Sequence, residues 1–379
     1  MNTLVTNIRQ LVTPTGAEPA HGERMGVLLV RENVHILLRG DRVAAVSDTR
    51  PSEKVDAVID ATGGIVLPGF IDPFFWAADP ANPDTTSLSP ATLLDRRAAS
   101  ALAQLIRHGT TAVEVRTPAV PSWHRAEEIL APVELAARQS CVRIHACFLG
   151  VPPAQPPRSS DDRISVLIGE TIPGVQRHRL ASCCAVLCGD GGYNRKEAKA
   201  ILRAAHGAGL GIKVQVSGPG SDAVLLASEL ETTTLDHLIR ASRAELERLR
   251  LADVIPVLLP GDPFLPGLPW ANARGMLDAG LAVALGSGAA ATGAGILSMA
   301  TILSLAVRAM GLNLAEAITA ITLNAAAALG LAHQLGTVEP GKQADLLILD
   351  LDNYRQISDF VVGLPVREVV AGGKVVCRT

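Results

Sequence analysis

Aromatic side chains are scarce in this chain of 379 residues: Phe, Trp and Tyr together make up 3% of it. A strong charge of either sign is lacking too. The net charge of -3 gives no electrostatic reason to expect nucleic acid or an anionic membrane as a partner. No disulfide framework is visible in the spacing of the six cysteines (141, 147, 183, 184, 188 and 377), so we expect a reducing cytoplasm. Residues 1–14 have no basic region before a long apolar run, which predicts no secretory signal.

An uncharged stretch, residues 280–307, needs a separate interpretation. Gly, Ser and Thr are concentrated in its middle, where a membrane span would need about 20 predominantly apolar residues. We therefore expect a buried strand, a loop of small residues and then a helix. Hydrophobic residues make up 48% of the chain, enough for a large core. The length suits one large α/β barrel plus a smaller module.

The pattern of apolar residues changes twice along the chain. Residues 1–66 read as short strands separated by turns, and the same texture returns after Gly336. Between them, eight apolar runs alternate with helix-like segments, starting at Ile65 and ending with LAVALG at 281–286. This alternation predicts parallel strands with helical crossovers, closed as a TIM-like (β/α)8 barrel. A doubly wound open sheet fits less well, because no glycine-rich nucleotide loop follows an early strand.

The two ends of the chain are expected to pack together, because chain termini often meet at a surface. The predicted domains are a composite β-sandwich of residues 1–66 plus 337–379 and a barrel of residues 67–336. Helix starts are marked by Ser89-Pro90, by the segment NRKEAK from residue 194, and by the pair Asn313 and Glu316.

Several segments resemble the amidohydrolase superfamily, and the imidazolonepropionases in particular. They include GGIVLPGFID (63–72), GTTAVEVR (109–116), TLDHL (234–238) and the tail GTVEPGKQADLLILDLDNYR (336–355). The Pro-Gly-Lys-x-Ala-Asp turn of the tail is the most specific of these. The resemblance covers almost the whole chain. It implies a barrel in which zinc or iron activates a water for attack on the ring carbonyl of a cyclic amide.

The residues that this resemblance would place around the metal differ from the family pattern. The family's first barrel strand ends in Asp-x-His-x-His, where this chain has Asp72-Pro73-Phe74-Phe75-Trp76. Gln215 stands at the histidine position of the fifth strand, and Gly288 at the aspartate position of the eighth. Aromatic rings and a glycine have no donor for zinc, and a glutamine carbonyl is a poor one. We therefore expect no metal cofactor, with Phe74, Trp76, Gln215 and Gly288 as degenerate metal positions.

Other family positions are changed as well. The acidic residue after the fifth strand is replaced by Ser217-Gly218, and the Gly-Tyr-Gly after the second strand by TPAV at 117–120. Val151 replaces the histidine after the third strand, and Cys188-Gly189 the Cys-Glu after the fourth.

Two side chains remain as candidate catalytic groups if the chain is active, His237 at the end of strand six and Glu114 on strand two. The alternative for each is a local structural role. Asp72 is read as a strand-end cap, and Cys188 as a small buried hydrophobe. Cys183 and Cys184 point to opposite faces of a strand, so they are not expected to chelate together.

Three functions are compatible with this sequence. The first is an imidazolonepropionase-like protein that is catalytically inactive and has a scaffold, assembly or ligand-binding role. We would expect it as a homodimer or as a heteromer with a related active enzyme. The second is an active hydrolase of a cyclic amide C–N bond with a non-standard or metal-free site. The third is a small-molecule sensor that uses the aromatic-lined mouth.

Overall fold

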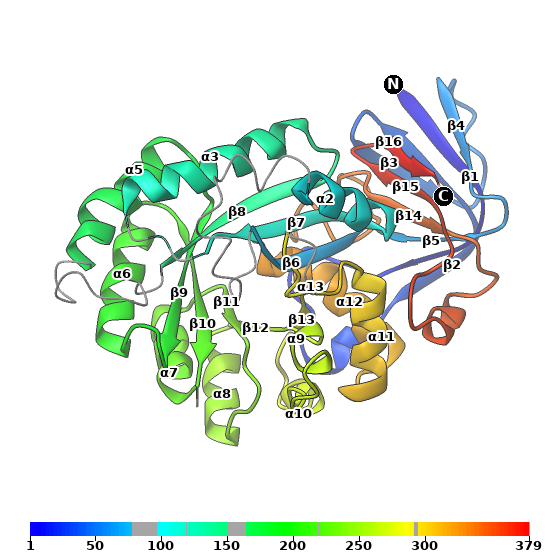
Figure 1. Ribbon diagram of the computed structural model, residues 1–379. Helices are drawn as coiled ribbons and strands as arrows, with labels where there is room; N and C mark the ends of the chain where they lie inside the picture. The colour runs from blue at the N-terminus through cyan, green and yellow to red at the C-terminus, as the bar shows by residue number, and fades with distance from the viewer. Residues whose placement is uncertain are drawn as a thin grey trace.

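Two β-sheets of eight strands each organise the residues that the structure describes (Figure 1). The structure is a computed structural model, and it describes residues 1–77, 97–118, 120, 122–150, 164–218, 220–291 and 295–378. One sheet forms the barrel and the other forms a β-module that contains both chain ends (Figure 1). The predicted fold class, a barrel with a separate module built from both ends, is confirmed.

The barrel sheet follows the order of the chain, because each strand pairs in parallel with the next one. Its strands are β6 (Phe70–Trp76), β7 (Thr110–Arg116), β8 (Arg143–Gly150), β9 (Cys183–Gly189), β10 (Gly211–Ser217), β11 (Thr234–Asp236), β12 (Ile255–Leu258) and β13 (Ala284–Leu285). The sheet closes beyond β13. There the Trp76 amide donates to the Ala289 carbonyl at 2.8 Å, and the Ala291 amide donates to the Trp76 carbonyl at 2.8 Å. The carboxyl ends of all the strands therefore meet at one mouth.

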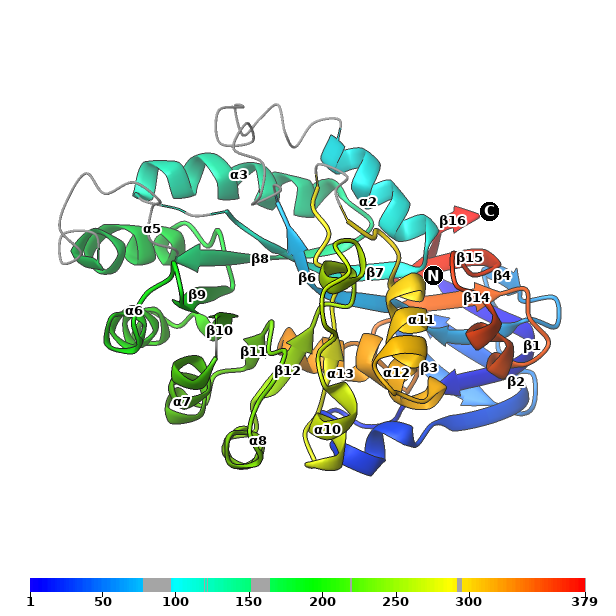
Figure 2. The ribbon, with the colours of Figure 1, turned by 60° about the horizontal axis from the view of Figure 1, so that its bottom comes forward.

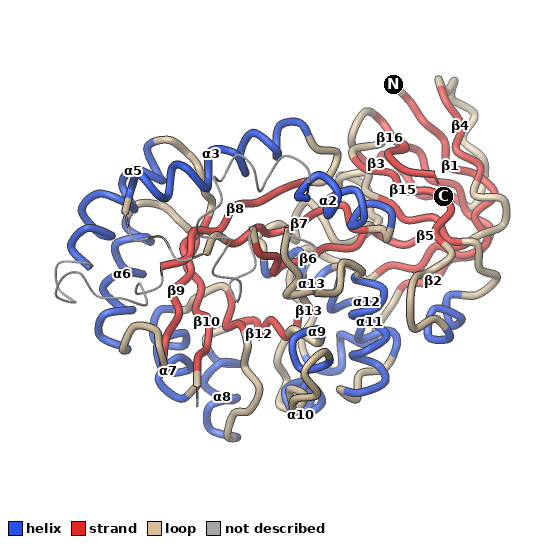
Figure 3. The backbone as a smooth tube through the Cα atoms, in the orientation of Figure 1, coloured by secondary structure: helices blue, strands red, loops and turns tan. Residues whose placement is uncertain are grey.

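Helices cover the outside of the barrel, as Figures 2 and 3 show. They are α2 (Arg97–Arg107), α3 (Trp123–Gln139), α5 (Ile172–Arg177), α6 (Arg195–Gly207), α7 (Ser221–Leu230), α8 (Arg243–Leu251), α9 (Gly261–Phe264), α10 (Ala273–Asp278), α11 (Met299–Ala309), α12 (Leu314–Ile321) and α13 (Leu323–Ala328). A short π-helix, η3 (Leu167–Thr171), precedes α5, and short 3-10 helices lie at η1 (Gly22–Gly26) and η4 (Tyr354–Asp359). Reciprocal capping bonds start α6 at Asn194 and α12 at Asn313, as predicted. The predicted cap at Ser89-Pro90 lies outside the described residues.

The β-module joins the two ends of the chain through one central pairing. Its strands are β1 (Asn2–Thr13), β2 (Leu29–Arg39), β3 (Arg42–Ser47), β4 (Ala57–Asp60), β5 (Ile65–Pro68), β14 (Leu346–Leu349), β15 (Val366–Ala371) and β16 (Lys374–Arg378). Strand β5 lies between β1, which it pairs in parallel, and β14, which it pairs in antiparallel fashion. The sheet curls around its own apolar core, and a bridge between Arg42 and Gln343 connects β3 to the segment before β14.

The first predicted barrel strand is divided at Gly69. Residues 65–68 belong to the module, and the strand that enters the barrel begins at Phe70. A Cβ at Gly69 would lie 2.3 Å from the Thr111 hydroxyl oxygen, so a larger residue would push β6 away from β7. The predicted domain boundary after residue 66 falls inside β5, and the division into domains stays a prediction.

The uncharged stretch of residues 280–307 contains β13 and most of α11. Within the described ranges, every helix is too short or too polar to cross a membrane.

Candidate functional site

Four of the side chains and backbone positions singled out from the sequence meet at the barrel mouth. The Phe74 ring packs edge-on against Trp76 and His237, with ring centroids 5.2 and 5.1 Å apart. The Gly288 amide donates to the Phe74 carbonyl at 3.1 Å. The ends of β6 and β11 and the segment after β13 therefore converge, as expected for a barrel of this kind.

Gln215 lies on β10, directly opposite Asp236 of β11, the residue before His237. Gln215 is 8% exposed. Its Oε1 is buried without a hydrogen-bond partner among the described residues. A buried carbonyl oxygen without a donor is costly, so this oxygen favours a ligand or water as its partner.

A fully buried arginine lies beneath the mouth. Arg116, at the end of β7, donates from Nε and Nη2 to Glu114 Oε1 at 3.1 and 3.0 Å. Its Nη1 forms an ion pair with Asp236 Oδ2 at 2.6 Å. The other side of the guanidinium faces the Phe74 ring, with Cζ 4.1 Å from the ring centroid. The sequence reasoning missed Arg116, although its alternation with Glu114 on one strand places both on the inner face.

Lys213 extends this network toward the bottom of the barrel. Its Nζ contacts Glu114 Oε2 and donates to the carbonyl of Ala328, the last residue of α13, at 2.8 Å. Burial alone would raise the pKa of Glu114, but Lys213 and Arg116 outweigh it and hold that pKa below its ordinary value. Burial raises the pKa of Asp236, and Arg116 opposes part of that rise. Two acids and two bases thus form a buried network without net charge.

His237 follows β11 with a positive φ of 63°. Its Nδ1 lies 3.4 Å from Asp262 Oδ2, and its Nε2 is buried without a partner among the described residues. Burial, reinforced by the charge of Arg116, lowers the pKa of His237 to about 4, so the imidazole is neutral at physiological pH. Burial also raises the pKa of Asp262 to about 6. This pair combines a neutral imidazole with a carboxyl that titrates just below neutral pH.

Asp262 occupies the space that a side chain at residue 288 would need. A Cβ built on Gly288 would lie 2.5 Å from Asp262 Oδ1. A carboxylate is therefore present beside the position that Gly288 leaves empty, but it comes from the segment after β12. The sequence reasoning missed Asp262. Its place directly after the strand run VLLPG was the available signal, since strand ends meet at the mouth.

Asp72 is fully buried inside β6 and supports the mouth from within. Its carboxylate accepts from the amides of Phe74 and Ser287, at 3.1 and 2.9 Å, and from the Ser287 hydroxyl at 2.5 Å. Burial raises its pKa to about 6. These bonds tie β6 to the segment after β13, which is consistent with the structural role expected for Asp72.

A set of potential metal ligands lies inside the barrel, where none was predicted from the sequence. Cys147 and Cys183 are opposite each other on β8 and β9, and the Cys183 thiol donates to Glu114 Oε2 at 3.7 Å. One ligand atom from each of Glu114, Cys147 and Cys183 lies within 4.8 Å of the others, and all three residues are buried. Burial raises the pKa of the Cys147 thiol well above its ordinary value. Replacing the two thiol protons by a divalent cation would leave the buried charge unchanged.

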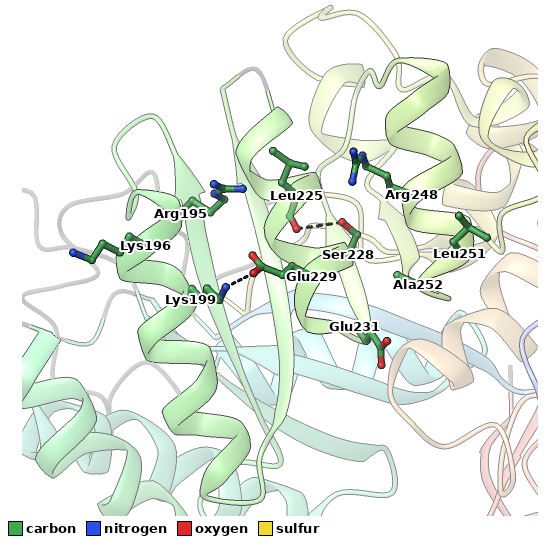
Figure 4. A pocket seen from close by; sticks show the side chains of 10 residues that line it. All are labelled: Arg195, Lys196, Lys199, Leu225, Ser228, Glu229, Glu231, Arg248, Leu251 and Ala252. Atoms are coloured by element: carbon green, nitrogen blue, oxygen red, sulfur yellow. Dashed lines mark hydrogen bonds and ion pairs between the residues drawn. The ribbon is translucent and has the colours of Figure 1, made fainter.

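The remaining candidates lie apart from the mouth. Cys184 and Cys188 are buried, and within the part of the chain that the structure describes neither belongs to a cluster of metal-ligating side chains. His124, a histidine that was not among these candidates, is exposed at the start of α3. Val151 and Ala119 lie outside the described residues. A surface hollow of about 730 Å³ between α6, α7 and α8 is lined by charged side chains, of which Lys199 pairs with Glu229 (Figure 4). It contains none of the residues predicted from the sequence.

A cavity of about 450 Å³ opens beside the pair His237 and Asp262. The rest of its lining comes from the end of β12, from the segments after β11 and β12, and from the residue that caps α11. Its walls are formed by Leu238, Ile239, Arg240, Leu258, Leu259, Pro260, Pro263, Leu268, Pro269, Ala271 and Met310.

Two bacterial relatives illustrate what the chain is similar to. The imidazolonepropionase of Geobacillus kaustophilus is 34% identical, with 98% of this chain and 97% of the relative covered. The imidazolonepropionase of Porphyromonas gingivalis is 32% identical, with 99% and 97% covered.

Solved structures show the same fold at lower identity. Atrazine chlorohydrolase TrzN from Arthrobacter aurescens TC1, complexed with zinc, superposes with a TM-score of 0.76 at 18% identity, covering 99% of this chain and 95% of that one. N-isopropylammelide isopropylaminohydrolase from Burkholderia multivorans gives a TM-score of 0.75 at 19% identity, covering 100% and 98%.

The expectation that the chain has no metal cofactor is wrong. A protein of this fold binds zinc, and three potential ligands converge here in Glu114, Cys147 and Cys183. The prediction failed because it considered the strand ends and pairs of cysteines within one strand, whereas Glu114, Cys147 and Cys183 come from three neighbouring strands. At the strand ends, Phe74 and Trp76 have no lone pairs, so those two positions do not fit a metal. The Cys/Cys/Glu set inside the barrel has donors that zinc accepts.

The sequence profile of the Amidohydrolase family matches residues 65–376. This match covers the whole barrel and the last strands of the module apart from the final residues. The chain therefore belongs to the amidohydrolase family, and within it resembles the imidazolonepropionases.

Proposed function

We propose that this chain is an imidazolonepropionase-like protein that binds a small cyclic amide at the barrel mouth and hydrolyses it far more slowly than its relatives do. The ring class comes from those relatives, which are named for imidazolone propionate and match nearly the whole chain. The observation that carries the proposal is the composition of the mouth. Phe74 and Trp76 stand at its first strand, with the paired cation Arg116 beneath them.

The mouth offers a flat amide ring both a planar contact at His237 and polar partners. The imidazole of His237 lines the cavity and offers a planar contact, and the buried rings of Phe74 and Trp76 support it from behind. Two buried polar atoms, Nε2 of His237 and Oε1 of Gln215, have no partner among the described residues. A ring amide carries an N–H and a carbonyl that can satisfy such atoms, and satisfying a buried polar atom favours binding.

Fast hydrolysis needs an activated water, and the groups at the mouth supply little activation. Phe74 and Trp76 cannot polarise or deprotonate water. With its pKa lowered to about 4, His237 is a weak base. We therefore expect the ring to bind and to persist.

The experiment is calorimetric titration with hydantoin, a stable five-membered cyclic amide, together with a hydrolysis assay on imidazolone propionate. The Geobacillus kaustophilus relative is assayed in parallel. We expect saturable hydantoin binding that His237→Asn weakens at least tenfold, and that His124→Asn, an exposed control, leaves unchanged. Turnover at least 1,000-fold below that of the relative is expected, which corresponds to roughly 4 kcal/mol. No binding, or turnover equal to the relative's, would overturn the proposal.

A second candidate function is hydrolysis by the pair His237 and Asp262. It is favoured by the pKa of Asp262, about 6, because a carboxyl that ionises near neutral pH can act as a general base. This function predicts measurable turnover that both Asp262→Asn and His237→Asn abolish. Turnover that survives Asp262→Asn would exclude it.

The oligomeric state is a separate proposal. We propose that the chain pairs with a second copy of itself or with a related active enzyme. Light scattering after size-exclusion chromatography measures it, and a monomer at all concentrations, alone and mixed with an active relative, would contradict it.

A further inference from the structure

The cavity beside His237 and Asp262 has a lining that differs from the mouth itself. Apart from these two residues and Arg240, its walls are leucine, isoleucine, proline, alanine and methionine side chains. Several are well buried, including Leu238, Leu258 and Met310. Others, such as Ile239 and Leu268, are more than half exposed at its rim. An apolar hollow with polar groups at one end is typical of a small-molecule site.

We propose that this cavity receives an apolar substituent of the ring ligand, so that the protein selects an alkyl- or aryl-substituted cyclic amide over one bearing a carboxylate. The inference rests on the proposed function, because it extends from the ring site at His237. It goes beyond that function by naming the substituent. The ring N–H is oriented toward the Asp262 carboxylate, and the side group points away from it into the apolar walls.

Charge at the cavity supports this choice of ligand. Asp262 lines the cavity and is ionised above about pH 6, so it repels an anionic substituent and accepts a hydrogen bond from an amide. Arg240 is the cationic member of the lining, and its side chain is exposed. An exposed cation is screened by water and salt and contributes little to holding a carboxylate. The buried aliphatic wall contributes more, since each buried CH₂ strengthens binding about fourfold.

The place of Asp262 also separates the ring from the side-chain pocket. Asp262 fills the space next to Gly288, on the mouth side, and also lines the cavity with His237. A ligand held by this pair therefore has its ring against His237 and Asp262, in front of the buried Phe74, and its substituent against Leu259, Leu268 and Met310. The size of the cavity, about 450 Å³, is ample for a four-carbon or phenyl group.

The test uses three probes that share one ring: hydantoin, 5-isobutylhydantoin and 5-(2-carboxyethyl)hydantoin. Calorimetric titration at pH 7.5 measures the affinity of each for the wild type. We expect the isobutyl probe to bind at least tenfold more tightly than hydantoin, and the carboxyethyl probe to bind no more tightly than hydantoin.

Three variants locate the effect. Leu268→Asp places a charge on the cavity wall and should remove the advantage of the isobutyl probe while hydantoin still binds. Leu135→Asp is the matched control, because Leu135 is similarly exposed on α3, away from the cavity, and this variant should keep the advantage. Arg240→Met should leave the order of the three probes unchanged.

The outcomes separate the two proposals. If hydantoin binds but the isobutyl probe binds no more tightly than hydantoin, the inference on the substituent is overturned and the ring site stands. The same holds if the carboxyethyl probe has the highest affinity and loses that advantage in Arg240→Met. If none of the three probes binds, the proposed function itself fails.

Discussion

The guanidinium of Arg116 lies against the ring of Phe74, with Cζ 4.1 Å from the ring centroid. This contact joins two residues that look unrelated in the sequence: a phenylalanine that is predicted to stand at a family histidine position, and an arginine at the end of the second barrel strand. A desolvated cation is attracted to the electron-rich face of an aromatic ring. The Phe74 ring at the mouth therefore covers the buried guanidinium of Arg116.

The first prediction concerns the cost of removing that charge. Arg116→Met leaves the buried carboxylate of Asp236 without its ion pair and takes one cation from Glu114. Breaking a buried pair by deleting one partner costs about 3–5 kcal/mol, because the remaining charge stays desolvated. Urea unfolding should show a loss of this size. Arg138→Met, which breaks the exposed pair with Glu134, should cost less than about 1 kcal/mol.

The double variant Arg116→Met with Asp236→Asn is measured by urea unfolding in the same experiment. Neutralising Asp236 removes the uncompensated charge, so the double variant should be more stable than Arg116→Met alone. If Arg116→Met unfolds like the Arg138 control, the buried network does not stabilise the barrel.

The sequence predicted the frame of the molecule well and its polar interior poorly. Alternating apolar runs and capping pairs such as Asn313 and Glu316 have local causes, so they could be read in order along the chain. The division at Gly69 could not, because it depends on the contact with Thr111 across two strands.

The same limit explains the residues missed at the site. Asp262 and Gly288 are 26 residues apart, and only the closed barrel places the carboxylate where a side chain at 288 would lie. Cys147 and Cys183 likewise become neighbours through the register of β8 with β9. Family positions were compared one by one, so compensation by a residue from another strand was invisible.

The second prediction tests whether Asp262 occupies the space of a side chain at residue 288, where Gly288 is predicted to stand at a family aspartate position. Gly288 has a φ of +65°, and its Cβ would clash with Asp262. Gly288→Asp should therefore lower the free energy of unfolding by more than the roughly 1–3 kcal/mol that a left-handed non-glycine residue costs. Gly330→Asp isolates the backbone cost, since Gly330 has a φ of +72° and nothing within 4 Å of its Cβ.

Adding Asp262→Ala to Gly288→Asp should recover the difference between these two variants, as measured by urea unfolding. If Gly288→Asp costs no more than Gly330→Asp, then the two positions do not compete for one space.

The third prediction concerns metal. We expect zinc added to the purified protein to be retained after desalting, and Cys147→Ser or Cys183→Ser to lower the zinc content measured by mass spectrometry. Thiolates are strong zinc ligands, and a serine hydroxyl at the same place is a poor one. Cys184→Ser is the control, because Cys184 is buried on the same strand but lies outside the cluster. Zinc that persists in the Cys147→Ser/Cys183→Ser double variant would place the metal elsewhere.

The fourth prediction follows from the pKa of Asp262, about 6 and raised by burial. Above that pH the carboxyl is ionised and accepts a hydrogen bond from a ring N–H, so hydantoin affinity should increase as pH rises from 5 to 7. His237 does not contribute to this change, because with a pKa of about 4 it is neutral throughout. Asp72 titrates in the same range but is occupied by Ser287 and Phe74.

In Asp262→Asn the affinity should be nearly independent of pH over this range, and that is the measurement that assigns the titration. The pH dependence of the stability of the ligand-free protein is a second, independent test of the same titration. A carboxyl whose pKa is raised on folding binds its proton more tightly in the folded state, so its contribution to stability declines as pH rises from about 4 to about 6. The difference in free energy of unfolding between Asp262→Asn and the wild type should therefore favour the variant more at pH 7 than at pH 4. An affinity that keeps its rise with pH in Asp262→Asn would assign the titrating group to another residue.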